Sequence, residues 1–143
     1  MIDCSGEYWH GDEADDINDY LKAYSGTDEI DVKPVYCHLC GGFSFLHRID
    51  SEEECIQVEC SRCRKKKTIL DCDKTWGFIK PRPIKCPECS GKKFNLRVGF
   101  IRRENGSVKW VYIGTRCARC GLLGSPLDWK ISYEPTDKME NNI

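Results

Sequence analysis

The chain has 143 residues, of which 40% are hydrophobic and 31% charged, and its formal net charge is −1. This composition indicates one globular domain or two very small ones and excludes a disordered or fibrous chain. No run approaches the roughly 20 apolar residues that cross a bilayer, and Met1–Glu7 lacks the basic and apolar regions of a secretion signal. We therefore expect a cytoplasmic protein without a membrane span.

The first segment, residues 1–33, is acidic and contains one predicted helix. Ten acidic residues face a single base, Lys22, over residues 1–31. Residues 12–24 place Ile17, Leu21 and Tyr24 at helical spacing, and Ser25-Gly26 is a typical helix end. A helix this short is marginal alone. We therefore expect it to pack these three side chains against the segment that follows, residues 34–78.

Eight of the eleven cysteines form four Cys-x-x-Cys pairs. One pair places two thiolates on one side of a metal ion, and a second pair completes the tetrahedron of a structural zinc site. Glycine at 41, 91 and 121 follows three of the pairs and allows the left-handed turn beneath the metal. Pairing neighbours predicts two sites, Cys37, Cys40, Cys60 and Cys63 in segment 34–78, and Cys86, Cys89, Cys117 and Cys120 in segment 85–134.

Two predicted β-hairpins favour this pairing over an interleaved one, which would cut across both. In the first, apolar runs at 43–49 and 56–58 flank a polar turn. In the second, runs at 94–101 and 108–113 flank Asn105-Gly106, a strong hairpin signal. Residues 79–84 are predicted as an extended linker, 125–133 as a further strand and 135–143 as a flexible tail.

The same cysteines limit the chemistry. Four thiolates around each ion leave no open position for substrate, so we expect two structural Zn²⁺ ions and no enzymatic activity. A thioredoxin-type pair needs a strand-to-helix junction, whereas an iron–sulfur cluster uses the same four thiolates and stays open as an alternative. Cys4, Cys55 and Cys72 are expected to lie outside the metal sites.

The predicted fold is therefore small, metal-stabilised and mainly β, with two zinc ribbons and a short N-terminal α-helix. Two binding functions fit it. The run Arg62–Lys67, with Trp76, Phe78 and Trp110 for stacking, favours nucleic acid. Carboxylates on the predicted helix favour a basic protein partner, although a solvated acidic face has the same pattern; these candidate partner-binding residues are Asp12, Glu13, Asp15, Asp16 and Asp19.

Several motifs beyond the cysteine pairs carry a family resemblance: Tyr8–Asp12, Ala14–Asp16, Gly114–Cys117 and Asp128–Pro135. Over nearly its whole length the chain resembles a group of small bacterial tandem zinc-ribbon proteins. Some of that group look like immunity proteins of contact-dependent or polymorphic toxin systems. The resemblance implies a non-enzymatic inhibitor whose partner is a toxin, such as a basic nuclease. The polar turn Asp50–Glu54 is also similar to the acidic tip of the transcript-cleavage factor ribbon, and a solvated turn explains it equally well.

Overall fold

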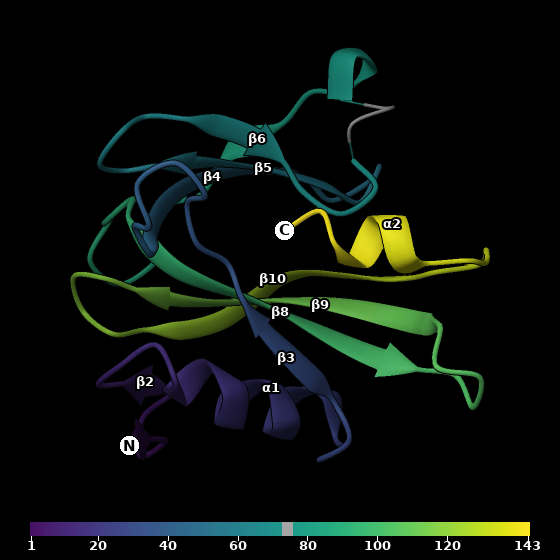
Figure 1. The fold of residues 1–143 in the computed structure, drawn as a ribbon. Helices are drawn as coiled ribbons and strands as arrows, with labels where there is room; N and C mark the ends of the chain where they lie inside the picture. The colour runs from purple at the N-terminus through teal and green to yellow at the C-terminus, as the bar shows by residue number, and fades with distance from the viewer. Residues whose placement is uncertain (73–75) are drawn as a thin grey trace.

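The computed structural model describes residues 1–72 and 76–143, so residues 73–75 of the predicted segment 34–78 lie outside the described part (Figure 1). The fold is mainly β, with two α-helices in the described part. Among the described helices, none is long and apolar enough to cross a membrane. The elements in chain order are β1 (Ile2–Asp3), β2 (His10–Gly11), α1 (Asp16–Ser25), β3 (Asp31–Pro34), β4 (Ser44–Asp50), β5 (Cys55–Cys60), β6 (Lys66–Thr68), the 3-10 helix η1 (Trp76–Phe78), β7 (Arg82–Pro83), β8 (Phe94–Arg102), β9 (Val108–Cys117), β10 (Leu123–Lys130) and α2 (Asp137–Glu140).

One antiparallel sheet runs through both segments that the sequence predicts as ribbons. Its strand order is β10-β9-β8-β4-β5-β6, and β3 pairs with β8 while β7 pairs with β4. The hairpins β4–β5 and β8–β9 meet where Phe45 pairs with Phe94. β7 lies within the predicted linker 79–84 and adds to the edge of β4. Figure 1 shows the sheet bent, so that β4, β5 and β6 lie over β8, β9 and β10.

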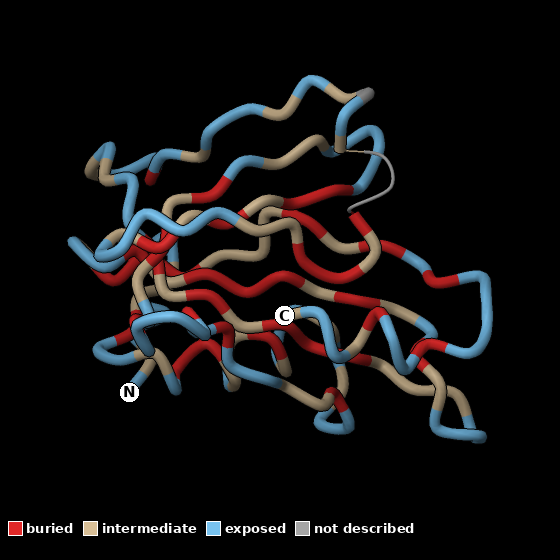
Figure 2. Tube along the Cα trace, turned by 45° about the horizontal axis from the view of Figure 1, so that its top comes forward, coloured by how far each residue is buried: buried red, intermediate tan, exposed pale blue. Residues whose placement is uncertain are grey.

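The main core fills the space between these two parts of the bent sheet. Period-two alternation along β8 turns Phe94, Leu96, Val98 and Phe100 toward it. Figure 2 shows buried stretches along the central strands and exposed connecting loops. Each fully buried side chain of this size contributes about 1.5–3 kcal/mol to folding. Because both hairpins supply side chains to one cluster, each depends on the other for its buried surface.

Helix α1 packs on the opposite face of β8, β9 and β10, so the expectation that it packs against residues 34–78 is wrong. Ile17 and Leu21 are fully buried there, whereas Tyr24 stays half exposed. Two glycines make the close approach possible. A Cβ on Gly114 would lie 2.5 Å from Cγ2 of Ile17, and one on Gly99 would lie equally close to a side-chain atom of Ile30.

The ends of α1 differ in how well local sequence predicts them. The helix begins at Asp16, later than the predicted residue 12, because residues 13–15 form hydrogen-bonded turns before it. Its end agrees with the Ser25-Gly26 signal. Gly26 adopts the left-handed conformation at φ 78°, and its amide donates to the carbonyl of Lys22.

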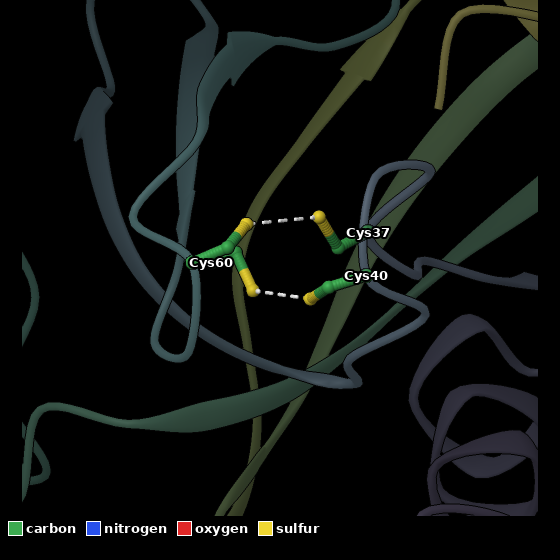
Figure 3. Close-up of side chains that lie close together, drawn as sticks. Cys37, Cys40 and Cys60 are labelled. Atoms are coloured by element: carbon green, nitrogen blue, oxygen red, sulfur yellow. Dashed lines mark hydrogen bonds between the residues drawn. The ribbon is translucent and has the colours of Figure 1, made fainter.

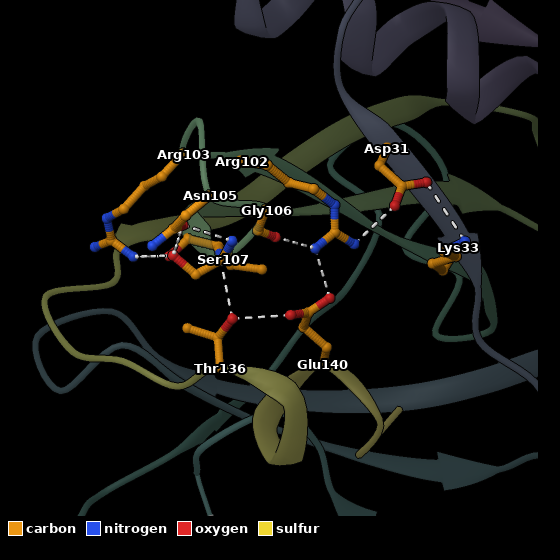
Figure 4. A network of polar contacts seen from close by, with 10 residues as sticks. Asp31, Lys33, Arg102, Arg103, Asn105, Gly106, Ser107, Thr136 and Glu140 are labelled. Carbon is orange, nitrogen blue, oxygen red and sulfur yellow. Dashed lines mark hydrogen bonds and ion pairs between the residues drawn. The ribbon is translucent and has the colours of Figure 1, made fainter.

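The C-terminal segment 135–143, predicted as a flexible tail, instead packs against the sheet. Met139 on α2 is buried in the main core. The Arg102 guanidinium donates to Asp31 at 2.8 Å and to Glu140 at 2.7 Å, and the Thr136 hydroxyl accepts the Val108 amide at 3.0 Å (Figure 4). These partners lie far apart in the sequence, so the polar composition of the tail does not reveal them.

Candidate metal centres

The first cysteine site brings two chain segments together. Cys37 and Cys40 lie in the loop between β3 and β4, and Cys60 and Cys63 lie at and beyond the end of β5. Their four sulfur atoms lie within 4.8 Å of one another, and the Cys37–Cys63 and Cys40–Cys60 sulfurs are each 3.5 Å apart. Figure 3 shows the side chain of Cys40 facing that of Cys60, with Cys37 on the same side of the site as Cys40.

The second cysteine site repeats this arrangement on the other hairpin. Cys86 and Cys89 precede β8, and Cys117 and Cys120 lie at and beyond the end of β9. All four sulfurs again lie within 4.8 Å, and the Cys86–Cys120 and Cys89–Cys117 sulfurs are each 3.5 Å apart.

These distances fit a metal ion and do not fit disulfides. Four sulfurs at about 2.3 Å from a tetrahedral ion are separated by about 3.8 Å, whereas a disulfide needs about 2.05 Å. The observed separations therefore surround a space of the size that one thiolate-bound metal ion needs. Both sites can hold an ion through four thiolates, and each combines two pairs that are neighbours in the sequence.

All four Cys-x-x-Cys loops share one backbone pattern. In each loop the amide of the fourth residue after the first cysteine donates to the carbonyl of that cysteine. The amide of the first cysteine donates to the carbonyl of the fifth residue. All eight of these bonds have donor–acceptor distances of 2.7–3.0 Å. The loops therefore form turns that hold the two sulfurs of each pair on the same side of the backbone.

The fourth residue after the first cysteine of every loop adopts the left-handed conformation. These residues are Gly41, Arg64, Ser90 and Gly121, with φ between 63° and 83°. The sequence interpretation assigned this role in the third loop to Gly91, but the left-handed residue there is Ser90. The loop of Cys60 carries Arg64 where two other loops carry glycine. Backbone hydrogen bonds thus impose the turn even where a side chain makes it unfavourable.

Backbone amides promote ionisation of two thiols in the first site, Cys37 and Cys60, and of Cys117 in the second. The amides of Cys63 and Arg62 lower the pKa of Cys60 to about 6. Burial opposes ionisation of Cys117, but the amides of Cys120 and Arg119 outweigh it and lower its pKa to about 7. A first thiolate disfavours a second one nearby, and a divalent cation removes that repulsion. Metal binding in each site therefore releases protons.

The three other cysteines lie outside both sites. Cys4 is exposed, and Cys55 and Cys72 are buried in the main core. The Cys72 sulfur accepts the amide of Ile56 at 3.2 Å, and the Cys55 thiol contacts the carbonyl of Glu53 at 3.4 Å. Burial raises the pKa of Cys72 well above its ordinary value. Cys72 is thus a neutral packing group, and Cys55 packs beside it in the same core.

The candidate partner-binding carboxylates divide into two groups. Asp16 is buried and accepts the amides of Asp12 and Glu13, so it stabilises the turn before α1. Asp15 is largely exposed and contacts Arg97 at 2.7 Å. Asp12, Glu13 and Asp19 are exposed. The structure thus leaves four of the five carboxylates at the surface and turns one inward.

Residues 60–103 form a basic stretch, with fourteen Lys and Arg residues against three acidic ones, and several of these basic side chains are engaged within the molecule. Arg102 contacts Asp31 and Glu140, and Arg103 donates to the carbonyls of Val108 and Ile131. Arg64 and Lys66 pair with Glu59.

The aromatic residues proposed for stacking also have internal contacts where they are described. Trp76 packs against the main core. The Trp110 indole donates to Asp128 at 2.9 Å. The side chain of Phe78 lies outside the described part.

Sequence reasoning missed the segment that packs over the second cysteine site. The amide of Gly11 donates to the carbonyl of Gly121 at 2.8 Å, and the His10 imidazole contacts the Glu88 carboxylate at 2.5 Å. Arg116, next to Cys117, donates to the carbonyls of Gly11 and Asp12. No local pattern near residue 11 indicates these contacts, because the partners are more than 70 residues away.

Comparison of the chain with protein-family models, curated proteins and solved structures finds no significant match.

Proposed function

We propose that the chain is a tandem zinc-ribbon protein that holds one Zn²⁺ ion in each cysteine site. The sulfur separations and the four matching turns support this assignment. Four thiolates complete the coordination of each ion and leave no position for a substrate. The ions therefore stabilise the fold, and the protein acts by binding rather than by catalysis. Elemental analysis of purified protein should return two zinc equivalents, whereas iron or one equivalent would contradict the assignment.

The partner that we propose is a basic protein, bound in the cytoplasm at the acidic surface around α1. The exposed carboxylates of Asp12, Glu13 and Asp19 lie on and just before this helix. Such a surface speeds association with a positively charged partner and disfavours negatively charged ones. An inhibitor of a bacterial toxin, such as a basic nuclease, has this requirement, because it must cover a surface that binds phosphates.

A contrast between acidic and basic side chains favours a protein partner over nucleic acid: most carboxylates near α1 are exposed, whereas many arginines are paired inside the molecule. Arg97, Arg102 and Arg103 belong to the basic stretch, yet each has a carboxylate or carbonyl partner inside the molecule. Ionisation of eight thiols and addition of two divalent ions also change the formal charge from −1 to −5. An acidic holoprotein with paired arginines favours a basic partner.

One observation favours the second candidate, a nucleic-acid partner. Tyr36, Leu39 and Phe43 are exposed beside the first cysteine site, with exposed fractions of 42%, 72% and 58%. Lys65 and Lys67 line the adjacent hollow with Leu39. Exposed rings beside lysines are a surface on which single-stranded bases stack.

Two charge variants test the choice. The first, Asp12→Lys/Glu13→Lys/Asp19→Lys, reverses the exposed carboxylates and spares the buried Asp16. The second, Lys65→Ala/Lys66→Ala/Lys67→Ala, removes the basic run. Each is used to capture partners from lysates of the source cells with and without nuclease treatment, and any captured protein is identified and purified for kinetics. We expect a basic partner whose association rate falls on the order of tenfold or more with the first variant and changes little with the second.

Salt provides the internal control for this measurement. The association rate of the unmodified protein should fall as ionic strength rises, and that of the first variant should not. If only the lysine variant loses its partner, and that partner is DNA or RNA, the protein-binding proposal is wrong.

A further inference from the structure

A cleft of about 290 Å³ opens between α1 and the segment before β2, next to the start of β10. We call it the aromatic cleft. Four aromatic side chains line it, two from the segment before β2 and two from the helix, together with Glu7, Ala23 and Leu123. The four aromatic residues are Tyr8, Trp9, Tyr20 and Tyr24.

The rings of the aromatic cleft are set at defined angles to one another. Tyr20 and Tyr24, one helical turn apart, are stacked with centroids 5.9 Å apart and planes at 19°. Trp9 stands edge-on to Tyr20 at 5.9 Å, with planes at 79°. Tyr112 of β9 supports Tyr24 from the side, edge-on at 6.0 Å. The cleft therefore has walls that differ in orientation, as an enclosure for a compact group requires.

Two of the four rings are accessible to solvent. Tyr8 is 41% exposed and Tyr24 is 49% exposed. Trp9 and Tyr20 are partly buried and pack against the small core of Ile17, Leu21, Ile30 and Leu123. On each side of the cleft, one ring is thus anchored in the core, Trp9 or Tyr20, and its neighbour, Tyr8 or Tyr24, is exposed to solvent.

The one charged side chain that lines the aromatic cleft is a carboxylate. It belongs to Glu7, which is exposed, and no basic residue is among the described residues of the lining. Asp19, Lys22 and Asp28 line a different hollow. The faces of aromatic rings carry partial negative charge and attract cations within about 6 Å of the centroid. The rings and the Glu7 carboxylate therefore both favour a positively charged ligand.

We propose that the aromatic cleft binds a cationic side chain, lysine or arginine, of the basic protein partner. The inference rests on the proposed function and adds the point of specific contact to it. The carboxylates of the α1 surface attract the partner over a distance, whereas the rings enclose one of its cationic groups after contact. Buried aromatic pockets are typical positions of the residues that carry most of the binding energy at interfaces.

Small probes of matched shape test the chemistry of the cleft. Choline and 3,3-dimethylbutan-1-ol have the same size and differ in charge at the branched end. Each is titrated into the zinc-loaded protein while the indole N–H resonance of Trp9, assigned with a Trp9→Phe variant, is followed by NMR. A lysine decamer is the third probe, and it represents the polypeptide source of the cation. We expect choline to shift the Trp9 resonance and the neutral alcohol to bind at least twofold more weakly.

Variants separate the rings from the general charge of the surface. Tyr24→Leu should weaken lysine-decamer binding about two- to fivefold, the expected effect of losing one cation–π contact. Tyr24→Phe keeps the ring and should bind within error of the unmodified protein. Tyr36→Leu removes an equally exposed ring beside the first cysteine site and should change nothing. Circular dichroism of each variant checks that the fold is kept.

The outcomes distinguish this inference from the proposed function. Equal binding of choline and the neutral alcohol would show that the cleft recognises shape and would overturn the inference. So would lysine-decamer binding that is lost on charge reversal at Asp12, Glu13 and Asp19 but unchanged by Tyr24→Leu. In both cases the acidic surface would still bind a basic partner, and the proposed function would stand. Tight binding of choline with no gain for the decamer would indicate a small-molecule site instead.

Discussion

The two cysteine sites have the same turns and sulfur separations, but they differ in what surrounds them. At the first site Cys40 is exposed, and Leu39 and Phe43 beside it are exposed as well. At the second site Cys89 and Cys120 are only partly exposed, and Gly11 bonds directly to the turn at Gly121. Local sequence therefore sets the shape of each cysteine turn, whereas distant segments determine what packs against it.

Loss of one ligand from each site should give the largest contrast. Cys63→Ser and Cys120→Ser replace matched positions, the last cysteine of each site. Loss of a structural metal costs more than about 4 kcal/mol, a large part of a typical total stability. We expect Cys120→Ser to release residues 1–31 and expose β8–β10, and Cys63→Ser to loosen mainly β4–β6. Hydrogen exchange followed by mass spectrometry measures both. Equal protection patterns in the two variants would contradict the comparison.

Alanine at the left-handed glycines gives the next largest difference. Both Gly41 and Gly121 have positive φ, so alanine costs about 1–2 kcal/mol of stability at either. A Cβ at Gly121 would also lie 2.6 Å from the carbonyl oxygen of Gly11, whereas nothing lies within 4 Å at Gly41. We expect Gly121→Ala to reduce the free energy of unfolding by about 1–3 kcal/mol more than Gly41→Ala. Denaturant unfolding of the zinc-loaded variants compares them, and equal losses would mean that Gly11 moves aside without cost.

We expect acid to destabilise the contact between the hairpins β4–β5 and β8–β9, because His47 is buried there. This side chain is 2% exposed, stands edge-on to Phe94, and neither of its ring nitrogens has a hydrogen-bond partner in the described part. Burial lowers its pKa to about 4. In the unfolded chain the pKa of a histidine is about 6.5, so the unfolded chain takes up the proton first. The stability that the neutral His47 contributes above pH 6.5 is therefore lost as the pH falls toward 4.

The control for this effect is His47→Leu, which removes the titrating group and leaves the metal ligands unchanged. Between pH 7.5 and pH 5.5 the unmodified protein should lose about 1 kcal/mol more stability than the variant, because protonation favours the unfolded chain. Acid protonation of the thiolates affects both proteins and cancels in the difference. Parallel pH profiles would show that His47 gains a proton without unfolding.

The smallest expected effects are gains in stability. Arg64 and Ser90 occupy left-handed positions that two other loops give to glycine. Ser90→Gly should stabilise the protein by about 0.5–1 kcal/mol, since relief of strain exceeds the entropy cost of glycine. Arg64→Gly should gain less, because it removes the contact with Glu59 at 2.9 Å. Arg62→Gly in the same loop has no strained φ to relieve and should be destabilising. Thermal unfolding resolves these differences.

Local chemistry was predictable from the sequence, and long-range pairing was not. Cys-x-x-Cys spacing and the Ser25-Gly26 helix end act over a few residues, so their geometry follows from the residues themselves. The contact between Phe45 and Phe94 and the burial of Ile17 beneath Gly114 join residues about 50 and 100 positions apart. Such contacts depend on which distant surfaces pack together. A glycine within a predicted strand indicates that another segment can approach closely, but it does not identify that segment.

The left-handed Arg64 and Ser90 show a second limit of sequence reasoning. Residue preference alone places glycine at such positions, and it pointed to Gly91 in the third loop. The turn is decided instead by two backbone hydrogen bonds to the first cysteine, which any residue can make. A preference of about 1 kcal/mol is too small to move a turn that these two bonds hold.

The glycines beneath α1 also have a consequence for the order in which the chain folds during synthesis. Helix α1 leaves the ribosome early, but Gly99 and Gly114, which receive Ile17 and Leu21, follow some 80–100 residues later. At typical translation rates of 5–20 residues per second, this delay lasts several seconds. Throughout that time the apolar face of a helix too short to be stable alone has no surface to pack on. The first cysteine site can close before then, so the N-terminal segment is made first but docks only after the second hairpin has been made.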